Sequence, residues 1–320
     1  MKVLVYGWYH QLNIGDDLFI DAFRKLFPDF EFVFRDNVKQ AHLEGIDAVF
    51  IGGGSFLLGK PQITEEALQT IKTKPIFYIG VGVESTIHPI HMELIRLAKL
   101  IATRTPKQVD RLREINPNTI WIPDLVYALQ DDVKQSPKLN RSVLVMPNLS
   151  VVPDHFNSHW MHASWGHFKS EFSQFLDTLV KEGYKLNFLS MCKADQINDD
   201  WAAGEIISHM AHRNSYLLKD QPAGIEQVTA AISKYSLIIT QRFHGIVLAE
   251  MTKVPYIALY HHDKLKETHP QNGTFLSHYN CSKQLLIDSF DQTMKMKFQR
   301  SLPIESDIYK TLVEEVRSSL

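Results

Sequence analysis

The 320-residue chain is predicted to fold as an α/β protein with two Rossmann-like, doubly wound domains that face a cleft. Short apolar runs alternate with amphipathic segments, which is the pattern of repeated βα units and parallel sheets. The length suits two domains of about 150 residues each. A polar stretch from about Leu129 to Arg141, which contains QDDVKQSPKLNR, is typical of an interdomain linker. We therefore expect an N-terminal domain at residues 1–135 and a C-terminal domain at residues 136–320.

Strands and helices are expected to alternate in both domains, with Gly or Pro at most of the joins. In the first domain the expected strands are Lys2–Tyr6, Glu31–Phe34, Ala48–Ile51, Ile76–Gly80, Leu100–Thr103 and Thr119–Ile122, and the expected helices are Asp16–Leu26, Glu65–Lys72, His91–Lys99 and Lys107–Ile115. In the second they are the strands Ser142–Met146, Leu186–Ser190, Ser215–Leu218, Leu237–Thr240 and Tyr256–Tyr260, and the helices Phe168–Glu182, Asp199–His212, Gly224–Lys234 and Ile246–Thr252. A charged C-terminal helix, Ser306–Leu320, suits packing back on the first domain.

Composition and charge narrow the possible functions. A net charge of -2 argues against non-specific nucleic-acid binding, which needs a surplus of Lys and Arg. Cys192 and Cys281 are too few for a disulfide framework, and no CxxC pair suggests structural zinc, so a reducing compartment fits. The N-terminal MKVLVYGWYH reads as a first strand and not as a signal peptide, and no apolar run approaches the roughly 18 residues of a membrane span. We expect a cytoplasmic protein and leave its oligomeric state open.

A glycine-containing loop, Gly7–Asp17 (GWYHQLNIGDD), follows the first expected strand and leads into a helix. Backbone N–H groups in such a loop suit anions or sugar oxygens. Asp16 and Asp17 lie at the helix start, where carboxylates complement the dipole, and simple capping by Asp16 explains them equally well. The spacing is not the GxGxxG dinucleotide fingerprint, so this loop alone is a weak signal.

Glycines also follow two later strands of the first domain. Gly52, Gly53 and Gly54 come after AVFI, and their missing Cβ atoms let a backbone or a ligand approach closely. A tight turn rarely needs three glycines, so we favour a loop that faces a ligand. Gly80 and Gly82 end the next strand in the same way and are less specific.

The most informative segment is Leu237–Gly245, with the sequence LIITQRFHG. A buried strand delivers Arg242 and His244 at its carboxyl end, where open α/β sheets bind ligands. Residues two apart on an extended segment point the same way, so both side chains are expected to face one ligand. Arginine suits carboxylate or phosphate, histidine exchanges protons near neutral pH, and Gly245 is expected to let the ligand approach the helix start. The alternative is a capping histidine and a surface arginine.

Taken in order, these motifs resemble the polysaccharide pyruvyl transferase family. The family pattern is a G-(x)n-N-x-G-D-(E/D) loop, a glycine triplet, G-x-G, S-x-R-D, and R-x-H-G with a downstream P-x-I-x-x-Y. The matching residues are Gly7–Asp17, Gly52–Gly54, Gly80 and Gly82, Arg242–Gly245, Pro255–Tyr260 and Lys264. The two-domain organisation also resembles the GT-B architecture of many glycosyltransferases.

Three positions depart from the family pattern. The S-x-R-D position reads Ala102-Thr103-Arg104-Thr105, which keeps the arginine and loses Ser and Asp. Glu84 stands where the family often has proline, and Met146-Pro147-Asn148 lacks an arginine that many members have. These departures bear mainly on the acceptor and less on the donor contacts.

The resemblance implies transfer of pyruvyl from phosphoenolpyruvate to a hydroxyl pair of a carbohydrate acceptor, a (poly)saccharide or its precursor, which forms a pyruvate ketal. No cofactor and no metal is implied. In this scheme His244 supplies a proton, while Arg242 and Arg104 bind the carboxylate and phosphate. The full set of donor-binding residues implied is Arg104, Gly52, Gly53, Gly54, Gly245 and Lys264. The acceptor-binding residues implied are Asn13, Asp16, Asp17 and Trp160.

Three other interpretations stay open at this point. A GT-B glycosyltransferase that uses a sugar nucleotide shares the architecture and the glycine-rich loops. A degenerate domain that binds carbohydrate without turnover fits the losses at Ala102 and Thr105. The segment DHFNSHWMHASWGH places four histidines, His155, His159, His162 and His167, at spacings that suit zinc on a helix face. Its composition favours a loop, however, which is solvated or stacks on a sugar through Trp160 and Trp165.

Overall fold

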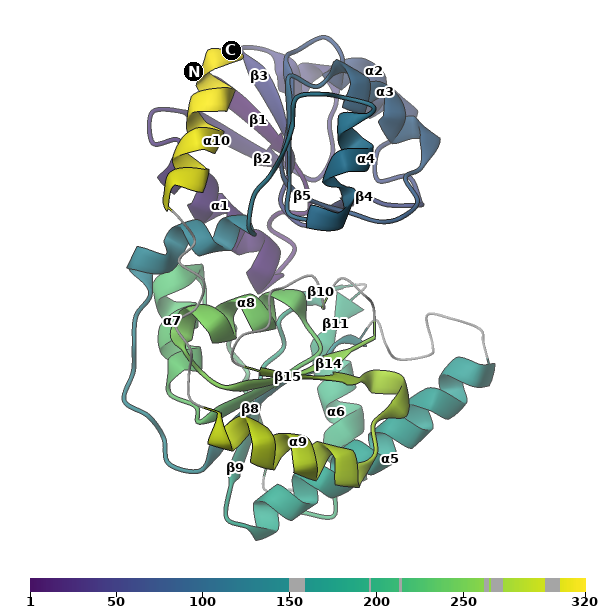
Figure 1. Cartoon of the computed structure of the whole chain (residues 1–320), viewed down its shortest axis with the longest axis vertical. Helices are drawn as coiled ribbons and strands as arrows, with labels where there is room; N and C mark the ends of the chain where they lie inside the picture. Colours follow the sequence, from purple (N-terminus) through teal and green to yellow (C-terminus); the bar gives the residue numbers. More distant parts are fainter. Residues whose placement is uncertain (150–158, 196, 213–214, 262–264, 266–272, 297–305) are drawn as a thin grey trace. The chain divides into compact units, whose positions relative to one another are not determined.

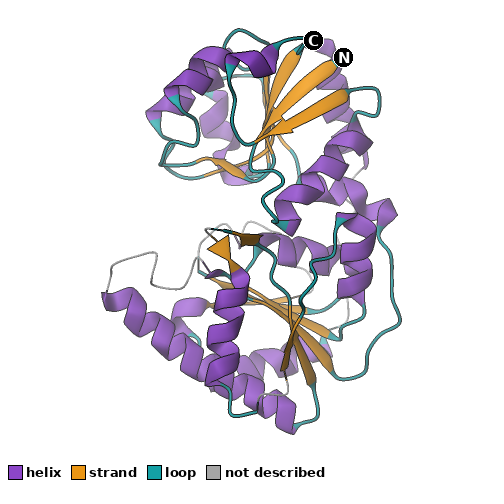
Figure 2. Ribbon diagram, turned by 180° about the vertical axis from the view of Figure 1, so that it is seen from behind, coloured by secondary structure: helices purple, strands orange, loops and turns teal. Residues whose placement is uncertain are grey.

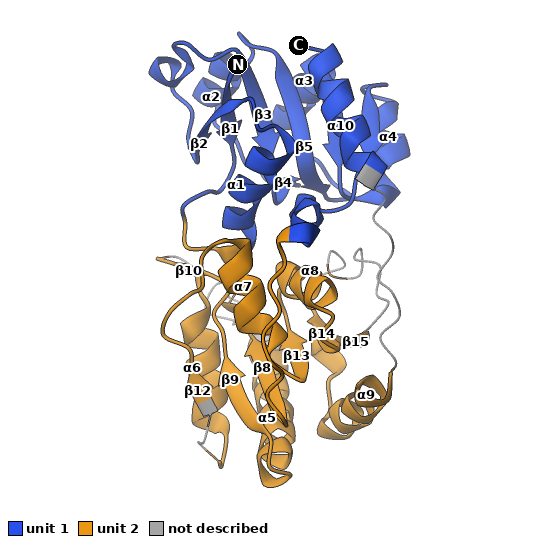
Figure 3. Cartoon of the chain, turned by 90° about the vertical axis from the view of Figure 1, so that its left-hand side faces the viewer, with its two compact units in different colours: residues 1–10, 15–131, 303–320 blue, residues 11–14, 132–302 orange. Residues whose placement is uncertain are grey.

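A computed structural model of the chain describes residues 1–149, 159–195, 197–212, 215–261, 265, 273–296 and 306–320 (Figure 1). The chain divides into two compact units (Figure 3). Unit 1 consists of Met1–His10, Gly15–Asp131 and Pro303–Leu320, and unit 2 consists of Gln11–Ile14 and Asp132–Leu302. Each unit is built around its own parallel sheet, so the predicted α/β class is confirmed. That the two units face each other across a cleft stays a prediction.

The sheet of unit 1 has seven parallel strands. They are β1 (Lys2–Tyr6), β2 (Glu31–Arg35), β3 (Ala48–Gly52), β4 (Ser55–Leu57), β5 (Ile76–Val83), β6 (Leu100–Thr103) and β7 (Thr119–Trp121). The strand order is β2-β1-β3-β5-β6-β7, and β4 pairs with β5 beside this path. Every residue of β3, β5 and β6 is buried, as expected for central strands of a parallel sheet that is covered on both faces.

Helices cover both faces of this sheet (Figure 2). They are α1 (Ile14–Leu26), α2 (Glu65–Ile71), α3 (Pro89–Leu97), α4 (Val109–Arg113) and α10 (Ser306–Ser318), with 3-10 turns at Gln40–Leu43, Pro106–Gln108 and Leu125–Asp132. Helix α2 begins where the Thr64 hydroxyl accepts a hydrogen bond from the Ala67 N–H, and α3 begins with Pro89, whose missing N–H is harmless at that position. Phe23 of α1 packs on Phe50 of β3 from one side of the sheet.

The sheet of unit 2 has six parallel strands in the order of a Rossmann fold. They are β8 (Ser142–Met146), β9 (Lys185–Phe188), β12 (Ser215–Leu217), β13 (Leu237–Thr240), β14 (Tyr256–Tyr260) and β15 (Gly273–Ser277). The order is β12-β9-β8-β13-β14-β15, which corresponds to 3-2-1-4-5-6. A short antiparallel hairpin of β10 (Lys193–Ala194) and β11 (Ile197–Asn198) follows β9.

The helices of unit 2 are α5 (His159–Lys181), α6 (Asp199–His209), α7 (Gly224–Ser233), α8 (Phe243–Thr252) and α9 (Lys283–Lys295), with a 3-10 turn at His278–Asn280. Side chains of α5, α6 and α9 share one core with the sheet, in which Phe172, Phe188 and Phe290 are buried. Every residue of α8 except Phe243 is buried, so this helix has no solvent-exposed face.

Two segments differ from the domain boundaries expected at residues 1–135 and 136–320. Residues 303–320 belong to unit 1, because the apolar face of α10 is buried there and the Tyr309 hydroxyl donates to the Asp124 carbonyl at 2.7 Å. Residues 11–14 belong to unit 2, where they pair with the loop after β9. The chain therefore passes between the units near its start as well as at the expected linker.

The expected linker packs along α7 of unit 2. The Lys134 N–H donates to the Thr229 hydroxyl at 2.9 Å, and the Ser136 N–H donates to the Ser233 hydroxyl at 2.8 Å. The strands β4, β10, β11 and β15 and the helix α9 were not expected from the sequence. Helix α9 does carry a start signal, because the Ser282 hydroxyl accepts a hydrogen bond from the Leu285 N–H.

Candidate active site at the carboxyl end of the unit 2 sheet

The motif Arg242–Gly245 lies at the topological switch point of unit 2. From β8 the sheet continues through β9 and β12 on one side and through β13, β14 and β15 on the other. Open α/β sheets bind ligands where the strand order reverses in this way, beyond the carboxyl ends of the strands. The register pairs Met146 of β8 with Thr240 of β13, so the segments that follow both strands start side by side.

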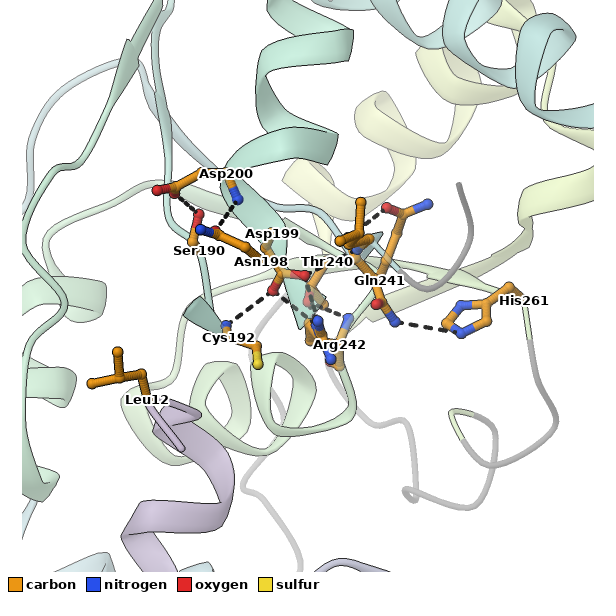
Figure 4. Close-up of polar contacts among 12 residues, drawn as sticks. Leu12, Ser190, Cys192, Asn198, Asp199, Asp200, Thr240, Gln241, Arg242 and His261 are labelled. Carbon is orange, nitrogen blue, oxygen red and sulfur yellow. Dashed lines mark hydrogen bonds and ion pairs between the residues drawn. The ribbon is translucent and has the colours of Figure 1, made fainter. Parts of the chain in front are cut away.

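Arg242 is the N-cap residue of α8 and forms a buried ion pair. Its backbone N–H donates to the Thr240 hydroxyl at 3.0 Å. Its Nε donates to Oδ2 of Asp199 at 3.0 Å, and its Nη2 donates to Oδ1 of the same carboxylate (Figure 4). The Arg242 side chain is 17% exposed and that of Asp199 is 0% exposed. The arginine is thus held by a carboxylate and still reaches the surface of the unit.

Asp199 is a site residue that the sequence analysis did not single out. It is the first residue of α6, and the side chain of Asn198 caps this helix by accepting from the Asp200 N–H at 3.0 Å. The Asp199 carboxylate accepts two further hydrogen bonds, from the Leu149 N–H at 3.0 Å and from the Cys192 N–H at 3.0 Å. One buried carboxylate therefore joins the segments that follow β8, β9 and β13.

His244 lies in the first turn of α8 and is buried, with 8% exposure. The expectation that Arg242 and His244 share an extended segment is wrong, because α8 begins at Phe243 and not at Ile246. Only Arg242 has an extended backbone. Arg242 therefore projects from the end of the strand segment, and His244 projects from the first turn of α8. Because only one residue separates them, both still lie at the switch point.

Gly245 has a packing role in this turn. A Cβ at this position would lie 2.1 Å from Oγ1 of Thr240 and 3.1 Å from Sδ of Met146. The close neighbour of Gly245 is therefore the end of the sheet, and the missing side chain lets α8 start directly against it. Its part in donor binding stays a prediction.

A buried hydrogen-bond chain adjoins the ion pair. The Gln241 side chain accepts from the Asn148 N–H at 3.0 Å and contacts Nδ1 of His278 at 2.9 Å. Since the backbone N–H fixes the Gln241 oxygen as the acceptor, its amide nitrogen donates to His278, whose Nδ1 carries no proton. Burial, together with the nearby His261, lowers the pKa of His278 to about 3. The Asn148 amide in turn contacts Nε2 of His261 at 3.5 Å.

The segment Gln11–Ile14 of the glycine-containing loop lies against the same site. Asn13 forms an antiparallel bridge with Cys192, flanked by hydrogen bonds from the Ile14 N–H to the Met191 carbonyl and from the Lys193 N–H to the Leu12 carbonyl, each 2.9 Å. Leu12 adopts a left-handed conformation with φ of 52°. Asn13, which was predicted to bind the acceptor, is thus placed two contacts away from the Arg242 ion pair.

In unit 1, the corresponding switch point lies between β1 and β3 and carries the glycine triplet. Gly53 and Gly54 have φ values of +68° and +82°, and a Cβ at Gly52 would lie 1.9 Å from the Ile79 carbonyl oxygen. The Tyr9 hydroxyl donates to the Gly52 carbonyl. Backbone conformation or close backbone packing therefore accounts for a glycine at each of the three positions, and donor binding by the triplet stays a prediction.

Asp16 and Asp17 lie within the first turn of α1. The helix begins at Ile14, so the suggestion that Asp16 is its cap is wrong. Asp17 accepts from the His10 N–H at 2.8 Å, and Oδ1 of Asp16 lies 2.8 Å from where a Cβ of Gly54 would be. The Asp17 carboxylate therefore holds the loop at His10, and Asp16 lies close to Gly54, while acceptor binding by either residue stays a prediction.

Arg104 follows β6 and is enclosed in unit 1. Its Nη1 forms an ion pair with Asp124, and the side chains are 3% and 2% exposed. Its Cζ lies 5.9 Å from the centroid of the Phe19 ring, and a Cβ on Gly82 would come within 3.3 Å of its Nε. The missing side chain of Gly82 thus makes room for this arginine, whose contact with a donor stays a prediction.

The histidine-rich segment is a helix from residue 159 onward, which corrects the expectation of a loop. Trp160 lies in the first turn of α5, whereas His155 and Lys264 lie outside the described residues. Trp165 is buried and stacks on Phe168 at 5.7 Å, so it belongs to the core and does not stack on a sugar.

Within the described part of the chain, no group of three or more His, Cys, Asp or Glu side chains has the arrangement of a metal site. None of the helices there combines the length and the apolar character that crossing a membrane demands.

Comparisons with known proteins agree with the fold and the motifs. The family model described as polysaccharide pyruvyl transferase matches residues 13–263. No curated protein matches the chain in sequence. Among solved structures, the UDP-GlcNAc 2-epimerase of Methanocaldococcus jannaschii is similar with a TM-score of 0.63 and 10% identity, covering 99% of this chain and 100% of that one.

Two further structures give the same result. The UDP-GlcNAc 2-epimerase of Neisseria meningitidis bound to UDP-GlcNAc has a TM-score of 0.56 and 12% identity, with 99% and 100% coverage. A putative UDP-N-acetylglucosamine 2-epimerase of Listeria monocytogenes has a TM-score of 0.61 and 11% identity, with 99% and 96% coverage. At such low identity the similarity concerns the fold, and it confirms the predicted GT-B-like α/β architecture.

Proposed function

Because the chain belongs to the polysaccharide pyruvyl transferase family, which is a family of enzymes, we propose that it moves pyruvyl from phosphoenolpyruvate to two hydroxyl groups of a sugar. The acceptor is a polysaccharide or its precursor, and the product is a cyclic pyruvate ketal. The observation that carries the proposal is the position of Arg242 and His244 in one turn at the switch point of unit 2.

The reaction needs a proton donor and fixed positive charge. A proton is added to the methylene carbon of phosphoenolpyruvate while one sugar hydroxyl attacks the central carbon and gives up its own proton. Phosphate then leaves with the bonding electron pair. A second hydroxyl attacks the same carbon, loses its proton and closes the ketal. Catalysis therefore rests on general acid–base chemistry and on cations that hold the carboxylate and the phosphate.

Arg242 supports binding of the anionic donor. Asp199 engages the Nε–Nη2 edge of its guanidinium, and the planar group carries a second pair of parallel N–H donors on Nη1 and Nη2. We assign this second pair to a carboxylate or phosphate of the donor, because two parallel N–H groups match two oxygens of such an anion. The start of α8 adds positive potential from its helix dipole.

His244 supports the proton transfers. It follows Arg242 by two residues, is 8% exposed and has the Phe243 ring edge-on at 5.4 Å, so its imidazole is largely kept out of bulk water. We propose that it protonates the methylene carbon and then accepts the proton of the attacking hydroxyl. A single imidazole suits both steps because this side chain can both donate and accept a proton.

The other predicted contacts stay predictions within this proposal. Arg104, Gly52, Gly53 and Gly54 are predicted donor contacts of unit 1, as is Lys264 outside the described residues. Asp16, Asp17, Asn13 and Trp160 are predicted acceptor contacts.

The deciding experiment is an incubation of the purified chain with phosphoenolpyruvate and a panel of galactosyl and N-acetylhexosaminyl acceptors, followed by mass spectrometry. We expect one acceptor to gain a pyruvate ketal and one phosphate to be released per ketal formed. Turnover is expected to survive a chelator, since the scheme places the positive charge on arginine. Turnover of a sugar nucleotide with no use of phosphoenolpyruvate would instead make the chain a glycosyltransferase.

A further inference from the structure

We propose that Asp199 is a positioning residue for the transfer reaction, and that it orients the guanidinium of Arg242 toward the anionic donor. The inference rests on the proposed function and adds to it a residue that no motif identifies. Asp199 lies 43 positions before Arg242 in the chain and meets it only in the folded unit. It acts through Arg242 and needs no contact with the substrate itself.

The carboxylate is itself rigidly held. It is fully buried, and both of its oxygens accept two hydrogen bonds: Oδ1 from the Leu149 N–H and Arg242, and Oδ2 from the Cys192 N–H and Arg242. Two of these donors are backbone groups in the segments that follow β8 and β9, so backbone on both sides of the switch point fixes where the carboxylate lies. The side-chain cap from Asn198 fixes the start of its helix as well.

This geometry restricts the arginine more than a single contact does. An arginine side chain has several rotatable bonds, and an exposed one populates many rotamers. Engaging both Nε and Nη2 fixes the plane of the guanidinium, and covalent geometry then places Nη1 on the side away from Asp199. Burial of an ion pair is weak evidence for a gain in stability, because desolvation offsets the attraction. Orientation of the charge is the better explanation for the pair.

The β1–α1 loop is part of the same arrangement. Asn13 pairs with Cys192, whose N–H is one of the donors to Asp199. The loop reaches this position through two left-handed residues, His10 with φ of 60° and Leu12 with φ of 52°. Such conformations cost free energy for residues other than glycine and persist where the surroundings hold them. The Gln11–Ile14 segment of unit 2 is therefore connected, through Cys192, to the carboxylate that orients Arg242.

The test compares two neighbouring carboxylates of α6. In Asp199→Asn, an NH2 group replaces one carboxylate oxygen and faces N–H donors from which it cannot accept a hydrogen bond. The two-point contact with Arg242 is therefore lost, while the size of the side chain hardly changes. Asp200→Asn is the matched control, because Asp200 lies in the same helical turn and contacts Ser190 and Lys193 but not the arginine. We expect the dissociation constant of phosphoenolpyruvate to rise about tenfold or more in Asp199→Asn and to stay within about twofold in the control.

A double-mutant cycle separates orientation from a loss of stability. Arg242→Lys alone is expected to weaken phosphoenolpyruvate binding about tenfold or more, and adding Asp199→Asn to it should change the dissociation constant by less than about twofold. The constants are measured by calorimetry well below each melting temperature. Additive effects of the two substitutions, or a lower melting temperature with unchanged affinity in Asp199→Asn, would overturn the proposal.

A measurement on the native chain covers the case in which Asp199→Asn does not fold. If a donor bound to Arg242 also stabilises its ion pair with Asp199, the amide hydrogens that donate to Asp199 should exchange more slowly with solvent when phosphoenolpyruvate is bound. The amides to follow are those of Leu149 and Cys192, with the Ala67 amide of unit 1, which donates to a threonine cap, as the control. Unchanged exchange at saturating phosphoenolpyruvate rejects the role of Asp199.

The same measurements with UDP-N-acetylglucosamine keep this inference distinct from the proposed function. If that compound is bound in place of phosphoenolpyruvate and shows the same coupling between Asp199 and Arg242, the positioning role holds and the pyruvyl transfer fails. If neither compound is bound by the native chain, both are rejected.

Discussion

Each unit holds an Arg–Asp ion pair with a buried carboxylate beyond the carboxyl ends of its strands, and the two pairs are built differently. In unit 1, Nη1 of Arg104 contacts Asp124, and both side chains are almost completely buried. In unit 2, Nε and Nη2 of Arg242 contact both oxygens of Asp199, and the arginine is partly exposed. The backbone carbonyl of Asp124 also accepts a hydrogen bond from the Tyr309 hydroxyl of the C-terminal helix α10.

We interpret this difference as one between an ion pair that mainly stabilises unit 1 and an ion pair that mainly orients an arginine in unit 2. The pair in unit 1 joins the segments after β6 and β7 and connects them to α10. The pair in unit 2 joins the segments after β8, β9 and β13 at the switch point, and its arginine precedes His244 by two residues. We therefore expect the unit 1 pair to act mainly on stability and the unit 2 pair mainly on donor binding.

The largest expected effect is on stability, from Asp124→Ala. The substitution leaves the buried Arg104 without this carboxylate, and breaking such a pair costs about 3–5 kcal/mol of unfolding free energy. Urea denaturation followed by circular dichroism measures it. Asp131→Ala is the control, because Asp131 is exposed and its carboxylate forms a surface ion pair with Nζ of Lys25 at 3.9 Å, which contributes little to stability. Equal stability of Asp124→Ala and the native chain would remove the distinction drawn between the two pairs.

The next largest effect is on turnover, from His244→Ala. Loss of a general acid–base group lowers kcat by about a hundredfold or more, while the dissociation constant of phosphoenolpyruvate should stay nearly unchanged. His209→Ala is the control, since His209 is exposed at the end of α6. Steady-state kinetics with phosphoenolpyruvate and a turned-over acceptor measure both variants. Near-normal kcat in His244→Ala means that another group moves the proton.

Arg242→Lys and Arg104→Lys compare the two arginines directly. Lysine keeps the charge and loses the paired donors, so Arg242→Lys should raise the KM for phosphoenolpyruvate by about tenfold or more. Arg104→Lys should raise it less and lower the melting temperature more, because Arg104 is almost completely buried. Initial rates over a range of donor concentrations, with thermal melts of the same samples, provide both numbers. A larger KM change for Arg104→Lys would place the main donor contact in unit 1.

Most of the fold was predictable because parallel strands are short apolar runs. The strands β1, β6, β8, β13 and β14 have the bounds expected from the sequence. The missed strand β15 reads GTFLS, in which Gly, Thr and Ser hide a strand that is stabilised mainly by pairing with β14. The start of α8 was placed too late because its N-cap residue, Arg242, is not a usual capping residue and makes no side-chain cap hydrogen bond.

The site was predictable only where chemistry lies in a contiguous motif. Arg242 and His244 stand together after an apolar strand, and this pattern led to the switch point of unit 2. Asp199 was missed because an acidic residue at a helix start is explained by the helix dipole alone. Its contact with Arg242 depends on the order of strands in the sheet, which the local sequence does not contain.

The smallest expected effect is on the pH dependence of stability, and it compares one buried imidazole in each unit. Burial, with His88 nearby, lowers the pKa of His91 in unit 1 to about 4, and burial beside His261 lowers that of His278 in unit 2 to about 3. Both values lie below the ordinary 6.5, so the unfolded chain binds these protons first as the pH falls. Stability is therefore full above pH 6.5 and is lost on acidification, down to about pH 4 for His91 and about pH 3 for His278.

His91→Leu tests the contribution of unit 1. His91 is fully buried against Phe56, and its Nε2 accepts a hydrogen bond from the Gln62 N–H at 3.3 Å. Leucine keeps the apolar packing and removes the titrating group, and the lost hydrogen bond lowers stability equally at both pH values. Between about pH 7 and about pH 5.5 the native chain should lose about 1 kcal/mol through His91, and the variant should lose correspondingly less. Urea midpoints at the two pH values measure the difference, with His209→Leu as the exposed control. The same drop in stability in His91→Leu and in the native chain would mean that His91 does not titrate differently on unfolding, and His278 would then have to account for the acid sensitivity.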